Sequence, residues 1–283
     1  MAPEVPVAAG LSTPPSWALE RVPGLERGEA PRLLAPLPGG SVNRVYRVES
    51  VAGRFVLRLN GAAWRRPGVD RSRELLLHRA AAAAGIAPAI VYAAPEAEGL
   101  LIMEYRDGSV WSPVEFGNRQ ALGRLGERLA ALHRLQAPMV AAFDPWAIAQ
   151  AYVQSIEALP DAAQRATDRA SVLSQLEHCC AVLLQLGTGT QGIVHGDLAA
   201  GNLLQGDRLW LLDWEYAQRG HPTLDLACVF AYYPQAAAHG REFAAAAGLE
   251  AMADGELLQA GVYVYRALTW LWHLARGEAL RAP

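Results

Sequence analysis

Apolar and polar residues alternate along two short stretches early in the chain, and this period of two predicts a β-hairpin. The stretches 43–48 and 54–59 flank a turn-like segment that contains Gly53. Because successive side chains of a strand point to opposite faces, Arg58 is expected on the face opposite Leu57. The hairpin begins a small sheet, since two further β-rich stretches follow it.

A helix and two more strands are predicted before residue 106. Asp70 can cap a helix that passes through an alanine-rich segment and stops at Gly85. The stretches 90–92 and 100–105 are predicted as strands, separated by a polar turn. Together with the hairpin they indicate an antiparallel sheet accompanied by one helix.

Beyond residue 106 the hydrophobic period changes to that of long helices. Leucines recur at helical spacing from Leu122 to Leu132. The other elements predicted here are a helical stretch, two short strands and an aromatic C-terminal helix, at 161–186, 193–194, 209–212 and 257–280.

This order of elements predicts an α+β protein with two lobes. The smaller N-terminal lobe, residues 31–106, would contain the antiparallel sheet, and the larger, mainly helical lobe would span residues 107–283. Residues 1–30 are rich in Pro, Gly and Ala and are predicted to form an N-terminal extension.

Composition and charge narrow the function classes. Hydrophobic residues make up 52% of the chain and charged residues 19%, which is typical of a folded globular protein. The formal net charge is −3, and the scattered arginines form no basic stripe, so nucleic acid is not expected as a partner. All 25 basic residues are Arg, so any phosphate contact must come from arginine rather than lysine.

The three cysteines show neither a paired pattern nor the spacing of a zinc site, which indicates a reducing compartment without structural zinc. No run of about 18 apolar residues is present, so no membrane partner is expected. We therefore expect a cytoplasmic protein, and the sequence leaves its oligomeric state open.

The segment His195-Gly-Asp197, followed by Asn202 and then by Asp213 at the end of a short apolar strand, carries the chemistry. Phosphoryl transfer needs one carboxylate beside the attacking hydroxyl, and further oxygen ligands for magnesium. Gly, Asp and Asn also form ordinary surface turns. The combination with His195 and the strand-borne Asp213 favours phosphoryl transfer.

These motifs, with Leu-Leu-Asp213-Trp-Glu-Tyr-Ala217, resemble the aminoglycoside phosphotransferase and choline kinase superfamily, which has a protein-kinase-like fold. The similarity is closest to the choline, ethanolamine and thiamine kinase branch. The resemblance implies that Asp197 is the catalytic base, that Asn202 and Asp213 hold Mg²⁺, and that ATP is the phosphate donor. His195 and Asp225 are expected to support the loop rather than to react.

The resemblance also implies a nucleotide site in the N-terminal lobe. Arg58 occupies the position of the phosphate-binding basic residue, and Glu74 that of its ion-pair partner. A glycine-containing turn would approach the phosphates, and the end of the last strand would contact adenine through its backbone. These residues are Gly39, Gly40, Ser41, Met103, Glu104 and Tyr105.

The segment after Asp213 suggests a cationic alcohol such as thiamine or choline as acceptor, held by aromatic faces and one carboxylate. The candidates are Glu215, Trp214, Tyr232 and Trp270, although aromatics at helical spacing usually belong to a core. A sugar, aminosugar or aminoglycoside kinase of the same superfamily is the alternative. A catalytically inactive nucleotide-binding protein is the alternative of another class, and a protein kinase is disfavoured because the chain leaves little room for a peptide platform.

Overall fold

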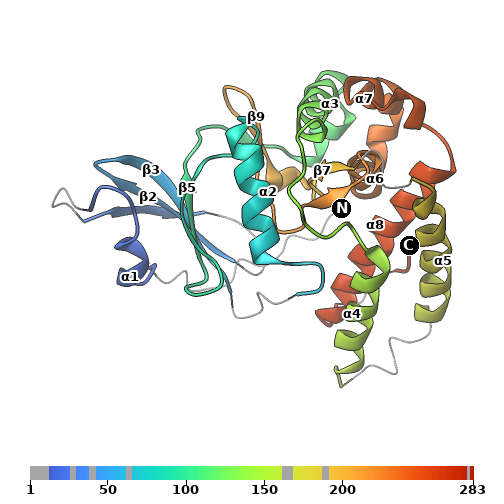
Figure 1. Cartoon of the computed structure of the whole chain (residues 1–283), viewed down its shortest axis with the longest axis horizontal. Helices are drawn as coiled ribbons and strands as arrows, with labels where there is room; N and C mark the ends of the chain where they lie inside the picture. Colours follow the sequence, from blue (N-terminus) through green and yellow to red (C-terminus); the bar gives the residue numbers. More distant parts are fainter. Residues whose placement is uncertain are drawn as a thin grey trace. The chain divides into compact units, whose positions relative to one another are not determined.

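The computed structural model describes residues 13–25, 30–37, 43–61, 66–160, 168–186, 191–278 and 281–283. The chain divides into two compact units (Figure 1). The first combines Met1–Trp64 with Pro88–Arg106, and the second combines Arg65–Ala87 with Asp107–Pro283.

The first unit is built on an antiparallel sheet with the strand order β1-β2-β3-β5-β4. The predicted hairpin is confirmed as β2 and β3, and the two later strands as β4 and β5. β1, which contains little alternation, was not predicted. The strands are β1 (Arg32–Pro36), β2 (Arg44–Ser50), β3 (Gly53–Leu59), β4 (Ile90–Ala94) and β5 (Leu100–Glu104).

One face of this sheet forms the core of the first unit. Leu57 on β3 lies opposite Tyr46 on one side and Ile102 on the other, and all three side chains are buried. The short helix α1 (Ser16–Leu19) contributes Ala18 to the same cluster. As the period of two predicts, Arg58 lies on the opposite face, where it too is mostly buried.

In the second unit, α2 (Arg71–Ala83) begins and ends where the sequence indicates. The side chain of Asp70 accepts a hydrogen bond of 2.9 Å from the backbone N–H of Arg73, which caps the first turn. Gly85 adopts a φ of 68°, in the left-handed region that commonly ends a helix.

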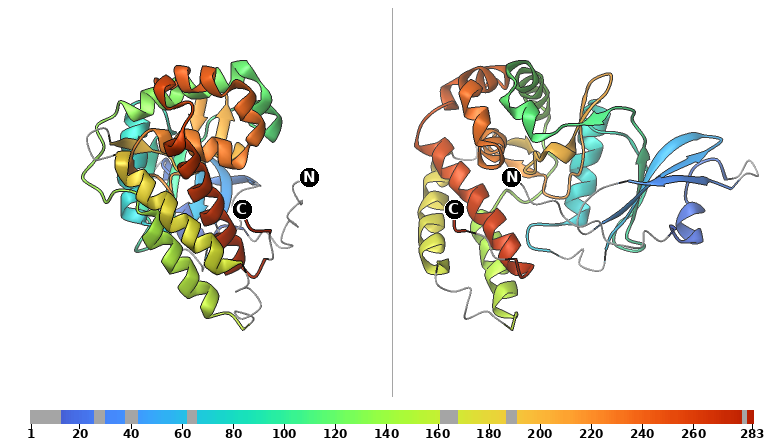
Figure 2. Two further views of the ribbon diagram at one scale, coloured as in Figure 1. Left: turned by 90° about the vertical axis from the view of Figure 1, so that its right-hand side faces the viewer. Right: turned by 180° about the vertical axis from the view of Figure 1, so that it is seen from behind.

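The remaining helices of the second unit surround two small sheets and form two apolar clusters. One cluster joins α4, α5 and α8, which lie side by side (lime, yellow and red in Figure 2). The other packs α3, α6 and α7 around the small strands. The helices are α3 (Arg119–His133), α4 (Pro145–Glu157), α5 (Arg169–Leu183), α6 (Thr223–Tyr232), α7 (Gly240–Ala246) and α8 (Glu256–Ala275).

The stretches predicted as helical beyond residue 106 correspond to α3, α5 and α8, while α4, α6 and α7 lie outside them. Of the stretch 161–186 that was predicted as helical, α5 begins only at Arg169, and residues 161–167 lie outside the described part of the chain. Short 3₁₀ helices complete the unit: η2 (Pro113–Gly117), η3 (Leu184–Leu186), η4 (Ala200–Asn202), η5 (Pro234–His239) and η6 (Glu250–Met252).

Two small antiparallel sheets position the two loops that carry the motif. β7 pairs with β10, while β8 lies between β6 and β9. The loop after β7 contains Asp197, and the loop after β9 contains Asp213. The strands are β6 (Ser109–Val110), β7 (Gly192–Val194), β8 (Leu203–Gln205), β9 (Leu209–Leu211) and β10 (Gln218–Gly220).

The α+β class with an antiparallel sheet and a mainly helical second part is therefore confirmed. Within the described ranges, no helix combines the length and the apolar character that a membrane span requires.

Candidate active site

The β8–β9 ribbon brings two loops to the same end of a sheet. We call them, after their predicted roles, the catalytic loop (residues 195–202) and the metal loop (residues 213–217). Leu203 pairs with Leu211, and one step beyond, the N–H of Leu212 donates to the carbonyl of Asn202 at 2.8 Å. Asn202 and Asp213 therefore emerge next to each other at the end of the ribbon.

Asn202 also fixes the predicted base. Its side-chain nitrogen donates to Oδ2 of Asp197 at 2.9 Å and to the Asp197 carbonyl at 3.0 Å. Because the amide nitrogen is used in this way, the amide oxygen of Asn202 is the atom suited to a cation.

The carboxyl group of Asp197 titrates at an unusually high pH. Burial raises its pKa to about 6, and the negative charge of Glu215 acts in the same direction, while hydrogen bonds from Asn202 and Tyr232 and the charge of Arg66 oppose the shift. A carboxylate with a pKa near neutrality is a better proton acceptor than an ordinary aspartate.

His195 holds the backbone of the two loops together. Its Nε2 donates to the carbonyl of Leu212 at 2.9 Å, and its Nδ1 accepts from the N–H of Asp197 at 3.3 Å. Both contacts require the neutral Nε2–H tautomer, and burial lowers the pKa of the imidazole, which favours the same form. His195 has the contacts of a loop-orienting residue.

Asp225 on α6 anchors the start of the catalytic loop. Its Oδ1 accepts from the N–H of Gly196 at 2.9 Å, and its Oδ2 accepts from the N–H of His195 at 3.0 Å and from Nε2 of His133 at 2.9 Å. Burial acts to raise the pKa of Asp225, but the hydrogen bond and charge of His133 and the bond from Gly196 outweigh it, so the pKa is lowered. Sequence reasoning did not single out His133, which lies 92 residues away along the chain.

Gly196 has to be glycine at this position. Its φ is 74°, and a Cβ atom there would lie 2.8 Å from the carbonyl oxygen of Tyr216. The catalytic loop therefore passes close to the metal loop because no side chain stands between them.

Asp213 has an uncommon backbone conformation. Its φ of 56° is the single positive value among the described non-glycine residues. Aspartate tolerates this left-handed region better than most residues, yet it still costs about 1 kcal/mol. The half-buried Asp213 carboxylate and the Asn202 amide oxygen are hard oxygen donors that fit Mg²⁺. In the described part of the chain no three His, Cys, Asp or Glu side chains meet as a metal cluster.

Of the aromatic residues predicted to bind the acceptor, two are buried in the core and one lies beside Asp197. Trp214 has no exposed surface, stacks on His78 and meets His195 edge-on. Trp270 belongs to the buried cluster of α4, α5 and α8. Tyr232 is half-exposed and hydrogen-bonds the Asp197 carboxylate. Of the three aromatics, only Tyr232 is brought beside the base.

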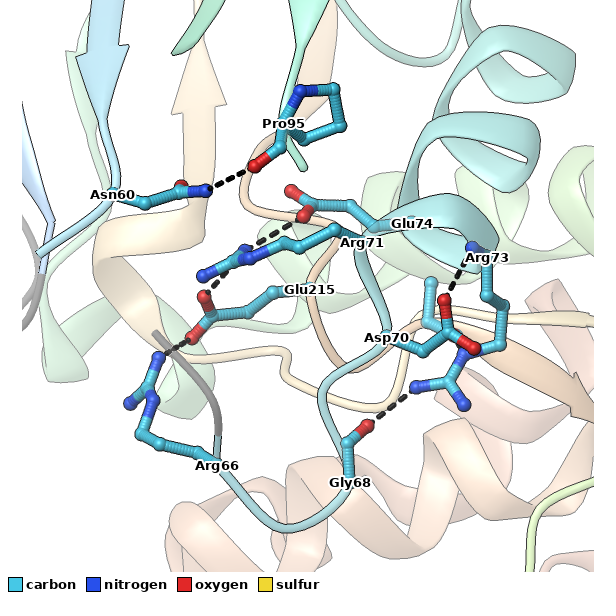
Figure 3. Close-up of polar contacts among 10 residues, drawn as sticks. Asn60, Arg66, Gly68, Asp70, Arg71, Arg73, Glu74, Pro95 and Glu215 are labelled. Atoms are coloured by element: carbon cyan, nitrogen blue, oxygen red, sulfur yellow. Dashed lines mark hydrogen bonds and ion pairs between the residues drawn. The ribbon is translucent and has the colours of Figure 1, made fainter. Parts of the chain in front are cut away.

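Glu215 lies in a network of arginines that sequence reasoning did not find (Figure 3). Its Oε1 accepts from Nη2 of Arg66 at 2.6 Å, and its Oε2 accepts from Nη1 of Arg71 at 3.1 Å. The same Nη1 of Arg71 donates to Glu74 at 2.7 Å. The signal that could have indicated this network is the density of arginines around the start of α2, in a chain without lysine.

The predicted nucleotide residues of the first unit are only partly described. Met103 and Glu104 end β5; the N–H of Glu104 donates to Ala89 at 2.9 Å and that of Tyr105 to Arg54 at 3.0 Å. Adenine binding by this segment stays a prediction, as does the pairing of Arg58 with Glu74, which belong to different units. The predicted phosphate loop, Gly39, Gly40 and Ser41, lies outside the described residues.

Residues 34–258 match the sequence model of the phosphotransferase enzyme family, and the match includes both loops of the site. The chain belongs to this family. The predicted superfamily and the predicted class, a small-molecule phosphotransferase, are thereby confirmed. No curated protein matches the phosphotransferase in sequence.

Solved structures resemble the phosphotransferase over most of its length. A choline/ethanolamine kinase family protein from Mesorhizobium loti is 24% identical, with a TM-score of 0.72 and coverage of 93% of this chain and 86% of that chain. Choline kinase LicA from Streptococcus pneumoniae is 18% identical, with a TM-score of 0.67 and coverage of 88% and 89%.

A thermostable mutant of aminoglycoside phosphotransferase APH(4)-Ia, in a complex with ADP and hygromycin B, is also similar. It is 18% identical, with a TM-score of 0.65 and coverage of 89% of this chain and 90% of that chain. At these identities the likeness demonstrates the fold, and the protein-kinase-like fold is confirmed.

Proposed function

We propose that this phosphotransferase moves the γ-phosphate of ATP to the hydroxyl of a small molecule, with Asp197 as the proton acceptor. The observation that carries the proposal is the Asp197 carboxylate, which is held by Asn202 at 2.9 Å and has its pKa raised to about 6. A fixed carboxylate of this basicity can orient an attacking hydroxyl and accept its proton.

The second part of the proposal is a magnesium site at Asn202 and Asp213. When bound, the ion would neutralise charge on the phosphates of the nucleotide. The residues contribute by fixing oxygen atoms in advance: the ribbon holds Asn202, and the strained backbone of Asp213 aims its carboxylate. Arg58, Glu74 and the other predicted nucleotide residues of the first unit remain part of the proposal.

Two acceptor classes are supported by different observations. A cationic alcohol such as thiamine or choline is supported by the fold shared with choline kinases and by the aromatic residue Tyr232, whose side chain hydrogen-bonds Asp197. A neutral sugar-like acceptor is supported by the pairing of Glu215 with two arginines, which neutralises the carboxylate that would attract a cation. Tyrosine hydroxyls at Tyr232 and at the hydrogen-bonded pair Tyr152 and Tyr216 would suit hydroxyl groups.

An ADP-release assay tests the proposal. Wild-type protein with ATP and Mg²⁺ is supplied in turn with thiamine, choline, ethanolamine, aminosugars, neutral sugars and aminoglycosides, and Asp213→Ala serves as the blank. Acceptor-dependent ADP release that disappears in Asp197→Ala supports the proposal, and the preferred acceptor decides between the two classes. ATP binding without release for any acceptor would instead support the inactive nucleotide-binding alternative.

A further inference from the structure

Three arginines from one short segment bind the C-terminal part of the metal loop. Arg66 and Arg71 bind the two oxygens of Glu215, and Nε of Arg73 donates to the carbonyl of Ala217 at 2.9 Å. We call Arg66, Arg71 and Arg73 the arginine clamp. It lies within the second unit, as does the loop that it holds.

The clamp is buried to a degree that is unusual for charged side chains. The side chain of Arg71 is 0% exposed, that of Glu215 6% and that of Arg66 13%. Moving such charges out of water is unfavourable, so a buried ion-pair network adds little to stability compared with an apolar packing. Its benefit is geometric, because the bonds fix the position of Glu215 and of the Ala217 carbonyl.

The metal loop needs such a fixing element. Asp213 adopts a left-handed backbone conformation, and a residue in that region keeps it only when its neighbours hold it. On the N-terminal side, the bond from Leu212 to Asn202 does so. On the C-terminal side, the Trp214 ring is packed in the core and Glu215 is bound by the clamp.

We propose that Glu215 is a positioning residue that orients Asp213 through the arginine clamp, rather than the residue that binds the acceptor. Both carboxylate oxygens accept hydrogen bonds from arginine, so its charge is balanced inside the protein. The network continues through Arg71 to Glu74 at 2.7 Å, which joins the start of α2 to the metal loop. The consequence for metal binding rests on the proposed function of Asp213.

The test uses a double variant that keeps the buried charges balanced. Arg66→Met combined with Glu215→Gln removes one cation and one anion, and it leaves the pair of Arg71 and Glu74 intact. A protein with Arg241→Met combined with Asp254→Asn serves as the matched control, because these two residues form an ion pair of 2.7 Å on the exposed surface.

The first readout is amide hydrogen exchange, which needs neither nucleotide nor acceptor. We expect faster exchange in peptides that cover residues 211–218 of the double variant, and unchanged exchange in the control. The second readout is calorimetric titration of ATP at increasing Mg²⁺. We expect the Mg²⁺ concentration for half-maximal ATP affinity to rise about tenfold, as is typical when a residue that orients a metal ligand is lost.

The possible outcomes separate the proposals. Unchanged exchange in residues 211–218 would overturn the positioning role, and weaker Mg²⁺ binding with unchanged exchange would instead make Glu215 a direct ligand. A raised KM for a cationic acceptor with unchanged Mg²⁺ dependence would make Glu215 an acceptor-binding residue. If exchange is faster in the double variant but the wild-type protein does not bind Mg²⁺-ATP, the proposed function is contradicted while the positioning role of Glu215 is supported.

Discussion

Replacing Asp197 by Asn should abolish turnover and, at the same time, stabilise the folded protein above pH 6. The pKa of Asp197 is raised from 3.8 to about 6 in the folded state, chiefly by burial. Between these two values the folded protein binds the proton more tightly than the unfolded chain does. The contribution of Asp197 to the free energy of unfolding is therefore most favourable below pH 4, and that contribution is lost as the pH rises to 6.

The size of the effect follows from the shift. Each pKa unit corresponds to about 1.4 kcal/mol, so ionised Asp197 destabilises the folded state by up to about 3 kcal/mol at pH 8. Asp197 as a whole residue keeps some exposure to solvent, and screening by that solvent reduces the expected value to roughly 1–3 kcal/mol. Asparagine carries no charge at any pH, and its carbonyl oxygen can still accept the hydrogen bond from Asn202.

The assay is thermal unfolding of wild type and Asp197→Asn at pH 5 and pH 8. We expect the variant to melt higher at pH 8, by roughly 3–8 °C, and its advantage to fall to about half at pH 5. An advantage of equal size at both pH values would show that the charge of Asp197 is not responsible. A variant that melts lower than wild type at pH 8 would contradict the raised pKa itself.

Three further predictions concern the same loops. In wild type, kcat/KM for the acceptor should rise with pH through about 6, as Asp197 loses its proton, and a profile that is flat from pH 5 to 8 would exclude this base. Asp225→Asn leaves one oxygen to accept three hydrogen bonds, so urea unfolding should show a loss of about 2–4 kcal/mol and steady-state assays a lower kcat. Gly196→Ala places a Cβ atom 2.8 Å from the carbonyl oxygen of Tyr216, at a φ of 74°. We expect urea unfolding to show a loss of at least about 1 kcal/mol in stability, and steady-state kinetics to show a larger change in kcat than in KM. Kinetics equal to those of the wild type would show that the two loops can move apart.

The parts of the molecule that the sequence predicted well are governed by local patterns. The β2–β3 hairpin follows from its alternation, and α2 from the cap Asp70 and the stop at Gly85. That Asn202 and Asp213 lie together was implied by the resemblance, and the structure brings them together through a short ribbon whose paired strands both residues flank. The predictions of the hairpin and of the helix each relied on residues within 16 positions of one another.

The parts that were missed depend on contacts between distant segments. His133 meets Asp225 across 92 residues, and Arg66 meets Glu215 across 149 residues, separations at which a single sequence has no periodic signal. Trp214 was considered for the acceptor site because of its position in the motif, but tertiary packing buries its ring between two histidines. The chemistry of a side chain suggests what it can bind, while its neighbours decide what it can reach.

The carboxylate of Asp225 also sets a rule for anyone who wishes to exchange parts between related enzymes. The catalytic loop receives its opening hydrogen bonds from α6, a helix that begins only after the metal loop has been completed. A graft that carries the catalytic loop alone would leave two backbone N–H groups without their acceptor unless the recipient supplies an equivalent carboxylate. A segment exchanged between such enzymes therefore has to carry at least the stretch from β7 to the first turns of α6. Ribosomal synthesis faces the same requirement, because the loop cannot make these hydrogen bonds until Asp225 has left the exit tunnel.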